Sequence, residues 1–165
     1  MQLRSLLPLL GSSVRNRPGA VAALIGGAVL ACGAAEGPAQ VGVTVTGLRS
    51  HKGQILACLT TNPRAFPDCS KDPQARKLTV ALSGSRETGP VRLDFGAVPQ
   101  GRYAISLIHD ENANGRLDTT MAIPREGYGF SRDAPVRMGP PRFDKAAFDL
   151  GAAAQHLDIR MRYLL

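Results

Sequence analysis

Residues 103–118 read YAISLIHDENANGRLD, an apolar run that is followed directly by a polar one. Within 103–108, most residues are apolar at both the odd and the even positions, which point to opposite faces of a strand. This is typical of a central strand that is covered on both faces. The polar part contains Asn114-Gly115, a strong turn signal. The stretch therefore predicts a buried central strand that ends in a polar loop.

Further short strands are predicted on both sides of this stretch. Val41, Val43 and Val45 alternate with small or polar residues, and other short alternating or apolar segments occur at 55–59, 78–82, 91–95, 148–150 and 157–163. Turn signals that contain Gly or Pro separate these segments. Seven short strands at this spacing favour an all-β fold, an antiparallel β-sandwich of immunoglobulin-like or transthyretin-like type.

Residues 40–165 are expected to form this single domain, preceded by a short linker at 36–39. A helical turn is expected near 145–147. Residues 119–142 are rich in Gly and Pro and are expected to form one long irregular stretch. Loops of this length inside a compact domain are usually functional or disordered.

The composition narrows the classes of function. The chain has 165 residues, of which 44% are hydrophobic and 5% aromatic, and it lacks Trp. These numbers suit one hydrophobic core, and they are unlike a multi-span membrane protein or a platform that stacks on bases or sugars. Part of the net charge of +7 comes from Arg4, Arg15 and Arg17, and the other basic residues are interspersed with acidic ones. No nucleic-acid partner is therefore expected.

The first 35 residues have the build of a secretory signal peptide. Arginines precede an uncharged run at 20–31, and the small residues Gly33-Ala34-Ala35 follow it. The run is too short for a membrane-spanning helix, so no membrane span is expected. Cleavage at the small residues is favoured, and the alternative is a lipoprotein signal that ends before Cys32 and leaves a lipid anchor there. The protein is accordingly expected to be periplasmic or secreted, or alternatively an outer-membrane lipoprotein.

Export also makes a disulfide possible. If Cys32 is removed or lipidated, Cys58 and Cys69 remain as an even pair around a polar segment that contains Pro. A bond between them would close this loop and stabilise the fold by about 2–3 kcal/mol. A metal site on these cysteines is not favoured, because their spacing differs from C-x-x-C and no His lies close by.

The polar loop carries oxygen-bearing side chains at the spacing of a calcium loop. Counted from the first of them, these side chains stand at positions 1, 3, 5 and 9, which are Asp110, Asn112, Asn114 and Asp118. Gly115 stands at position 6, where such a loop turns sharply, and Arg116 at position 7 would offer its backbone carbonyl. Hard oxygen donors without a cluster of His or Cys suit Ca²⁺, which is the expected cofactor.

Two features separate this loop from an EF-hand. Position 12 is Met121 instead of a bidentate Glu, and the loop follows a predicted strand instead of a helix. Glu126 is the nearest downstream carboxylate that can fold back to complete the ligand set. The alternative is that the Asp and Asn side chains only form turns at the tip of a hairpin. Both interpretations stay open.

The segment at 127–131 reads GYGFS and follows the polar loop. Tyr128, Phe130 and Ser131 are the candidate residues of a long loop that binds a partner, either a protein or a glycan. The sequence around Ser131 lacks the second Gly of a nucleophile elbow, so no catalytic residue is assigned.

Two classes of function follow from these features. The favoured one is an exported, non-catalytic domain that holds Ca²⁺ structurally and presents its loops to a partner. The alternative is a periplasmic metal-assisted hydrolase, in which Asp110, Glu126 or His109 would act as acid, base or water activator around the ion.

The segment at 103–133, YAISLIHDENANGRLDTTMAIPREGYGFSRD, resembles the signature of a family of uncharacterised exported bacterial proteins, domain of unknown function 2141. The similar elements are HDEN-x-NG-x-LD and IP-x-EGYGFS, and a later part is supplied here by Pro141-Arg142-Phe143 and Ala147-Phe148. The resemblance covers residues 40–163. It implies an exported β-sandwich domain with no assigned activity.

Overall fold

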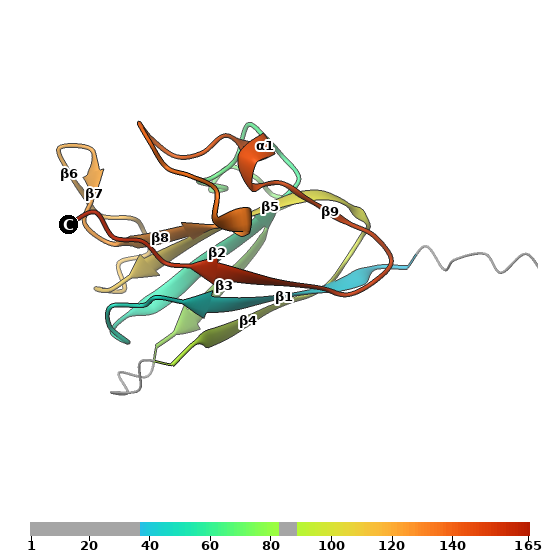
Figure 1. Cartoon of the computed structure of the whole chain (residues 1–165), viewed down its shortest axis with the longest axis horizontal. Helices are drawn as coiled ribbons and strands as arrows, with labels where there is room; N and C mark the ends of the chain where they lie inside the picture. The colour runs from blue at the N-terminus through green and yellow to red at the C-terminus, as the bar shows by residue number, and fades with distance from the viewer. Residues whose placement is uncertain (1–36, 83–88) are drawn as a thin grey trace, which may run out of the picture. The chain divides into compact units, whose positions relative to one another are not determined.

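The computed structural model describes residues 37–82 and 89–165 (Figure 1). The expected signal peptide at 1–35 and the candidate anchor residue Cys32 lie outside the described residues. The described part is mostly β, as the sequence predicts, and it contains one short α-helix. No helix in this part is long and apolar enough to cross a membrane.

One sheet has three strands in the order β10, β1 and β4, which are Gln155–Arg160, Ala39–Thr46 and Val91–Val98. The side chains of Val41, Val43 and Val45 on the central strand β1 are fully buried. Their alternation predicts this burial, because successive residues of a strand point to opposite faces of the sheet.

A second sheet has five strands. Across it follow, in order, β3 (Arg76–Ala81), β2 (Gln54–Thr60), β5 (Gly101–Asp110) and β8 (Gly127–Phe130). The fifth strand, β9 (Phe148–Leu150), also pairs with β5. β5 pairs with β2 on one side and with β8 and β9 on the other. The prediction of a central strand at 103–108 is therefore confirmed.

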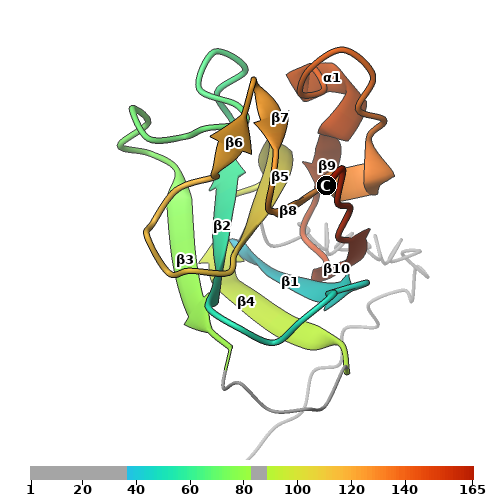
Figure 2. The same ribbon diagram turned by 90° about the vertical axis from the view of Figure 1, so that its left-hand side faces the viewer.

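Four small elements complete the described chain (Figure 2). β6 (Thr119–Thr120) and β7 (Ile123–Pro124) form a two-stranded hairpin, and one turn of 3-10 helix, η1, spans Ser131–Asp133. The helix α1 (Phe143–Ala146) lies close to the predicted helical turn. The expectation that 119–142 is one irregular stretch is wrong, because β6, β7, β8 and η1 all lie within it.

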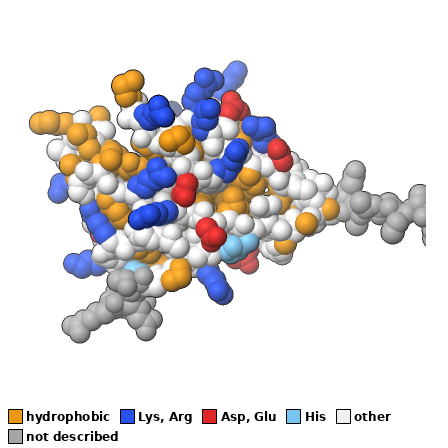
Figure 3. Space-filling view, in the orientation of Figure 1, with side chains coloured by type: hydrophobic (Ala, Val, Ile, Leu, Met, Phe, Trp, Pro, Cys, Tyr) orange, Lys and Arg blue, Asp and Glu red, His pale blue; other side chains and the backbone are white. Residues whose placement is uncertain are grey.

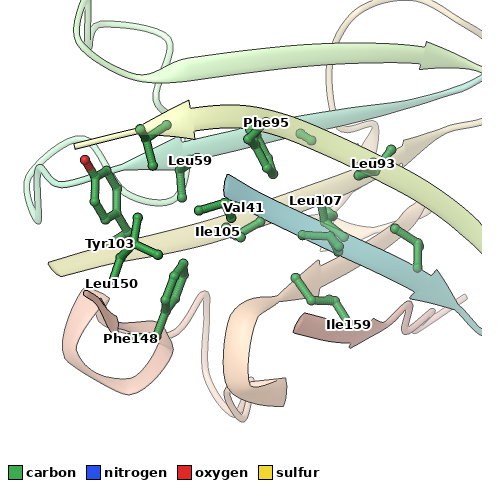
Figure 4. Close-up of a cluster of buried hydrophobic side chains, with 14 of the residues drawn as sticks. Val41, Leu59, Leu93, Phe95, Tyr103, Ile105, Leu107, Phe148, Leu150 and Ile159 are labelled. Carbon is green, nitrogen blue, oxygen red and sulfur yellow. The ribbon is translucent and has the colours of Figure 1, made fainter. Parts of the chain in front are cut away.

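The main hydrophobic core takes side chains from both larger sheets (Figure 4). Val41 and Ile159 come from the three-stranded sheet, and Ile105 and Leu107 come from β5 of the five-stranded sheet. Each of these side chains is at most 1% exposed. Since burying one such side chain contributes about 1.5–3 kcal/mol, this shared core holds the two sheets against each other.

A smaller apolar cluster covers the other face of β5. Ala104 is fully buried there together with Phe130 of β8 and Phe143 of α1. The ring of Phe66 lies 5.8 Å from the ring of Phe130 and 5.9 Å from that of Phe143. Burial of both faces of β5 is the reason why this strand is apolar at even and at odd positions.

The expectation of a wholly antiparallel arrangement is wrong at β10. This strand runs parallel to β1, with Val43 opposite Leu157. Parallel neighbours need a long connection, and nearly the whole domain lies between these two strands in the sequence. The strand expected at 157–163 also ends earlier, at Arg160, and Arg162 then pairs with Tyr128 of β8. The last residues of the chain therefore pass from one sheet to the other.

The predicted disulfide between Cys58 and Cys69 is confirmed. Cys58 lies in β2, Cys69 lies in the loop that follows this strand, and their Cα atoms are 6.5 Å apart. The same loop is held by a buried hydrogen bond that the hydroxyl of Thr60 donates to the carboxylate of Asp72. One covalent bond and one buried polar contact thus attach this loop to the end of β2.

Candidate functional site

The loop between β5 and β8 starts and ends at the same end of the five-stranded sheet. The two strands are antiparallel neighbours, with His109 opposite Gly127. The residues that follow β5 and those that precede β8 are therefore brought together. Asp110 and Glu126 lie at the base of this loop, where they are 0% and 5% exposed.

Glu126 closes the loop with both of its carboxylate oxygens. Oε1 accepts a hydrogen bond from the backbone N–H of Glu111 at 2.9 Å, and Oε2 accepts one from the backbone N–H of Asp118, also at 2.9 Å. Glu126 thus folds back onto the loop, and the groups that it binds there are N–H donors at the start and in the middle of the loop. Hydrogen bonds to an ionised acceptor are among the stronger ones in proteins, so this carboxylate stabilises the closed loop.

Asp110 shapes the first half of the loop. Its Oδ1 accepts the backbone N–H of Asn114 at 3.0 Å, and its Oδ2 accepts the backbone N–H of Gly115 and the side-chain amide of Gln54, each at 2.7 Å. The turn before β2 approaches closely at Gly53, where an added Cβ would collide with the backbone carbonyl oxygen of Asp110. Backbone N–H groups of the loop and the side-chain amide of Gln54 therefore position this carboxylate.

Asp118 lies on the outer side of the loop, and its side chain is 30% exposed. Its oxygens accept hydrogen bonds from the side-chain amides of Asn112 at 2.8 Å and Asn114 at 3.0 Å. The hydrogen bonds from Asn114 and Asn112 hold the pKa of the Asp118 carboxyl below its usual value. The carbonyl oxygens of the two asparagines accept backbone N–H groups of the same loop.

The structure brings the expected metal ligands into one loop, where N–H groups are their main partners. Within 37–82 and 89–165, no group of three or more His, Cys, Asp or Glu side chains is placed to hold a metal ion. The side chain of Arg116 is 78% exposed, and its Nε lies 3.5 Å from Asp118. A cation at this loop would bind Asp118 and asparagine carbonyl oxygens, and it would displace the amide hydrogens that now face Asp118.

Arg49, which the sequence analysis did not identify, joins three segments beside this loop. Its guanidinium donates hydrogen bonds to the carboxylate of Glu111 and to the backbone carbonyls of Arg125 and Leu165. It also lies 4.5 Å from the centre of the Tyr163 ring, a cation–π contact. No local sequence signal marks Arg49, because these hydrogen-bond partners are 62, 76 and 116 positions away.

His109 is fully buried at the end of β5, and both of its ring nitrogens have partners. Nδ1 lies 2.7 Å from the hydroxyl of Tyr163, and Nε2 lies 3.0 Å from the backbone carbonyl oxygen of Lys52. Because a carbonyl oxygen only accepts, we assign the hydrogen to Nε2, and Nδ1 accepts from the hydroxyl. With this tautomer, both ring nitrogens of His109 are hydrogen-bonded to groups inside the protein.

The three candidate residues of the partner loop are buried. Tyr128 and Phe130 belong to β8 and are 5% and 8% exposed, and Ser131 is fully buried. The hydroxyl of Ser131 donates to the backbone carbonyl of Ala146 at 2.6 Å and accepts the backbone N–H of Ile105 at 2.9 Å. These residues are buried because β8 pairs with β5, and the second apolar cluster covers that part of the sheet.

A shallow groove of about 620 Å³ lies elsewhere, on the outer face of the three-stranded sheet. Its lining includes Thr44, Arg92 and His156. The hydroxyl of Thr44 lies 2.7 Å from Nε2 of His156, and Gly42 leaves room for the imidazole ring. None of the expected site residues lines this groove, so it is separate from the loop at 110–126.

The comparisons with known proteins identify a family and no activity. Neither a curated protein nor a solved structure matches the chain. A family model with the description "Uncharacterized protein conserved in bacteria (DUF2141)" matches residues 43–158. This match begins in β1, ends in β10 and includes the whole loop at 110–126. The chain therefore belongs to the bacterial DUF2141 family, the family that its HDENANGRLD motif resembles.

Proposed function

We propose that this protein is an exported, non-catalytic domain whose loop at 110–126 binds Ca²⁺ weakly. The observation that carries the proposal is the convergence of four oxygen-bearing side chains with Glu126 in one loop whose backbone is already curled by hydrogen bonds to Asp110. Preorganisation of this kind lowers the cost of ordering ligands around an ion.

The expected affinity for Ca²⁺ is low because N–H groups of the protein already occupy the oxygens that would bind the ion. The side-chain amides of Asn112 and Asn114 donate to Asp118, and these contacts must be exchanged for metal contacts. Glu126 is engaged by two backbone N–H groups and cannot serve as a bidentate ligand without releasing them. The dissociation constant is therefore expected near the range of extracellular calcium modules, about 10⁻⁴–10⁻³ M.

For the fold, we propose a β-sandwich related to the immunoglobulin-like or transthyretin-like types. The support is the single core that takes side chains from the three-stranded and the five-stranded sheets. The parallel pairing of β10 with β1 distinguishes this sandwich from a wholly antiparallel one.

For the compartment, we propose the periplasm or the exterior, with an outer-membrane lipoprotein anchored at Cys32 as the alternative. The apolar run at 20–31 after three arginines supports export. The Cys58–Cys69 disulfide is consistent with an oxidising compartment. A protein or glycan partner would contact the exposed residues of the loop at 111–125, since Tyr128 and Phe130 are buried.

Thermal melting tests the calcium proposal. If Ca²⁺ binds only the folded state, an excess of one hundredfold over the dissociation constant stabilises the fold by about 2.7 kcal/mol. For the dissociation constant expected here, this excess is about 10–100 mM Ca²⁺. The melting temperature should therefore rise in Ca²⁺ of this concentration relative to chelator, and Asp118→Asn should remove most of this rise. Asp158→Asn changes an exposed carboxylate on β10 and should keep the whole rise.

Isothermal calorimetry gives an independent readout of the same site. Uptake of Ca²⁺ by the unmodified chain and by Asp158→Asn, together with its loss in Asp118→Asn, supports the proposal. Identical melting in Ca²⁺ and chelator, with no heat of binding at millimolar Ca²⁺, would show that the loop is only a hydrogen-bonded turn.

A further inference from the structure

The turn of the β6–β7 hairpin holds two residues other than Gly in a left-handed backbone conformation. Met121 and Ala122 connect the two strands and have φ values of 49° and 63°. Two-residue hairpin turns with positive φ strongly favour Asn and Gly, because other side chains are strained there. Burial does not compensate this strain, since Met121 is 94% exposed and Ala122 is exposed too. Ile123, the next residue, is 44% exposed. The hairpin thus presents two apolar side chains to solvent at a conformational cost.

Two more exposed apolar side chains lie at the same end of the domain. Leu164 and Leu165 are 56% and 59% exposed. Arg49 brings the two segments together, because its guanidinium binds the carbonyls of Arg125, directly after β7, and of Leu165. Figures 1 and 2 both place the C-terminus at the end of the domain that carries the hairpin. We call this group of four side chains the apolar tip: Met121, Ile123, Leu164 and Leu165.

The surroundings of the apolar tip are basic. Arg116 and Arg125 are exposed beside the hairpin. The nearby acidic side chains are engaged, because Glu111 pairs with Arg49 and Asp118 accepts hydrogen bonds from two side-chain amides. Figure 3 shows hydrophobic side chains next to Lys and Arg at this end of the molecule. The tip therefore combines apolar side chains with cations at its margin.

We propose that the apolar tip docks on the surface of an anionic lipid bilayer. Its four side chains offer less area than the roughly 800 Å² per partner that a stable protein interface buries. Membrane docking requires less, because a few apolar side chains enter the boundary between headgroups and acyl chains while Lys and Arg meet the phosphates. Exposed Met, Ile and Leu side chains beside arginines meet both requirements.

This docking is distinct from an anchor at the N-terminus. β1 begins at Ala39, at the end of the domain opposite the hairpin (Figure 1). Gln100 lies near Gly37 and Pro38 at that opposite end and is exposed. It therefore offers a control position that is exposed like Met121 and remote from the tip.

The lack of Trp in the chain permits a direct test. In the full chain, Met121→Trp puts one fluorophore in the tip, and Gln100→Trp puts one at the opposite end. Each variant is mixed in chelator with vesicles of phosphatidylglycerol and phosphatidylethanolamine, or of phosphatidylcholine alone. With the anionic vesicles, the Met121→Trp emission should shift to the blue and be quenched by brominated acyl chains, whereas the Gln100→Trp emission should stay unchanged.

Charge dependence distinguishes headgroup recognition from general adhesion. Raised ionic strength and Arg125→Glu should each weaken the Met121→Trp shift, because both reduce the attraction between arginines and phosphates. Ile123→Trp provides a second position in the tip if Met121→Trp melts early. Unchanged tip emission at both positions, or an equal shift for Gln100→Trp, overturns the proposal. Because chelator is present, this outcome is independent of the calcium proposal.

Discussion

The carboxylates of this loop bind N–H groups at positions where the sequence predicts calcium ligands. Asp110 and Glu126, which the sequence predicts to be calcium ligands, accept hydrogen bonds from backbone N–H groups of the loop. Both an ion and an N–H group are positive partners for a carboxylate, so the same curled loop suits either. Asp110 and Glu126, which accept three and two hydrogen bonds, are the most buried carboxylates of the loop.

Glu126→Gln should destabilise the protein. The amide nitrogen of Gln cannot accept a hydrogen bond, so the backbone N–H of Glu111 or of Asp118 loses its partner. A loss of about 1–3 kcal/mol in the free energy of unfolding is expected, measured by urea denaturation. Asp149→Asn, in an exposed position of β9, is the control and should change little. Equal stabilities of Glu126→Gln and the unmodified chain would contradict the bridging role.

Stability should fall in acid because of Glu111 and Asp118. Hydrogen bonds from two asparagines lower the pKa of Asp118. For Glu111, burial raises the pKa of the carboxyl, but the hydrogen bonds from Arg49 and Ser50 have the larger combined effect, so its pKa is lowered. Unfolded-state values are about 3.9 for Asp and 4.3 for Glu. Since the folded-state values lie lower, the stabilisation is complete above this range and disappears as the pH falls through the folded-state values.

Glu111→Gln isolates one part of this acid effect. The variant should be less stable than the unmodified chain at neutral pH, because the ion pair with Arg49 is lost. It should also lose less stability on acidification to about pH 3, since one carboxylate with a lowered pKa is gone. Denaturant unfolding at both pH values measures the difference. The same pH dependence in both chains would be inconsistent with this role of Glu111.

At the scale of elements, strand pairing and one tight turn position the loop. The register of β5 against β8 brings Asp110 and Glu126 to the base of the loop. The turn before β2 packs against the same base, and the backbone carbonyl of Lys52 in that turn accepts from His109. The geometry of the candidate site is therefore a consequence of how three segments meet.

Gly53→Ala tests this close approach. Gly53 has a φ of 71°, and an added Cβ would collide with backbone atoms of Asp110 and Glu111, which cannot rotate away. The strained backbone alone is expected to cost about 1–3 kcal/mol in unfolding free energy, and the collision adds to it. Gly151→Ala is the matched control, because nothing lies within 4 Å of a Cβ at that position. Similar melting of the two variants would refute the packing described here.

At the scale of the whole domain, two sheets share one core, and the C-terminal segment links them. β10 belongs to the three-stranded sheet, whereas Arg162 pairs with β8 of the five-stranded sheet. Tyr163 then bonds to His109, and Arg49 binds the carbonyl of Leu165. The chain is thus held at its C-terminal end by contacts to three segments that are remote in the sequence.

The disulfide contributes at this scale, because it restricts the whole unfolded chain. Replacing Cys58 and Cys69 together by Ser should lower the free energy of unfolding by about 2–3 kcal/mol, the loop-closure estimate for a loop of this size. Urea denaturation with and without reductant measures it: reductant should weaken the unmodified chain by a similar amount and leave the double variant unchanged. A further effect of reductant on the double variant would contradict this explanation.

Local patterns predicted much of what the structure contains. The alternation of Val41, Val43 and Val45 predicts their burial, and the apolar run at 103–108 predicts a central strand. The even pair of cysteines around a polar segment predicts the disulfide. The motif at 109–118 predicts membership of the family and the convergence of its own polar side chains. Each of these signals acts within about ten residues of the chain.

Long-range packing accounts for what these patterns missed. The parallel pairing of β10 with β1, the burial of Tyr128 and Phe130, and the contacts of Arg49 all join residues that are far apart in the sequence. Periodicity shows that a strand has a buried face, but it does not select the neighbour or the direction of pairing. That selection depends on the packing of all strands together, which also brings Glu126, directly before β8, back to the backbone N–H groups of Glu111 and Asp118.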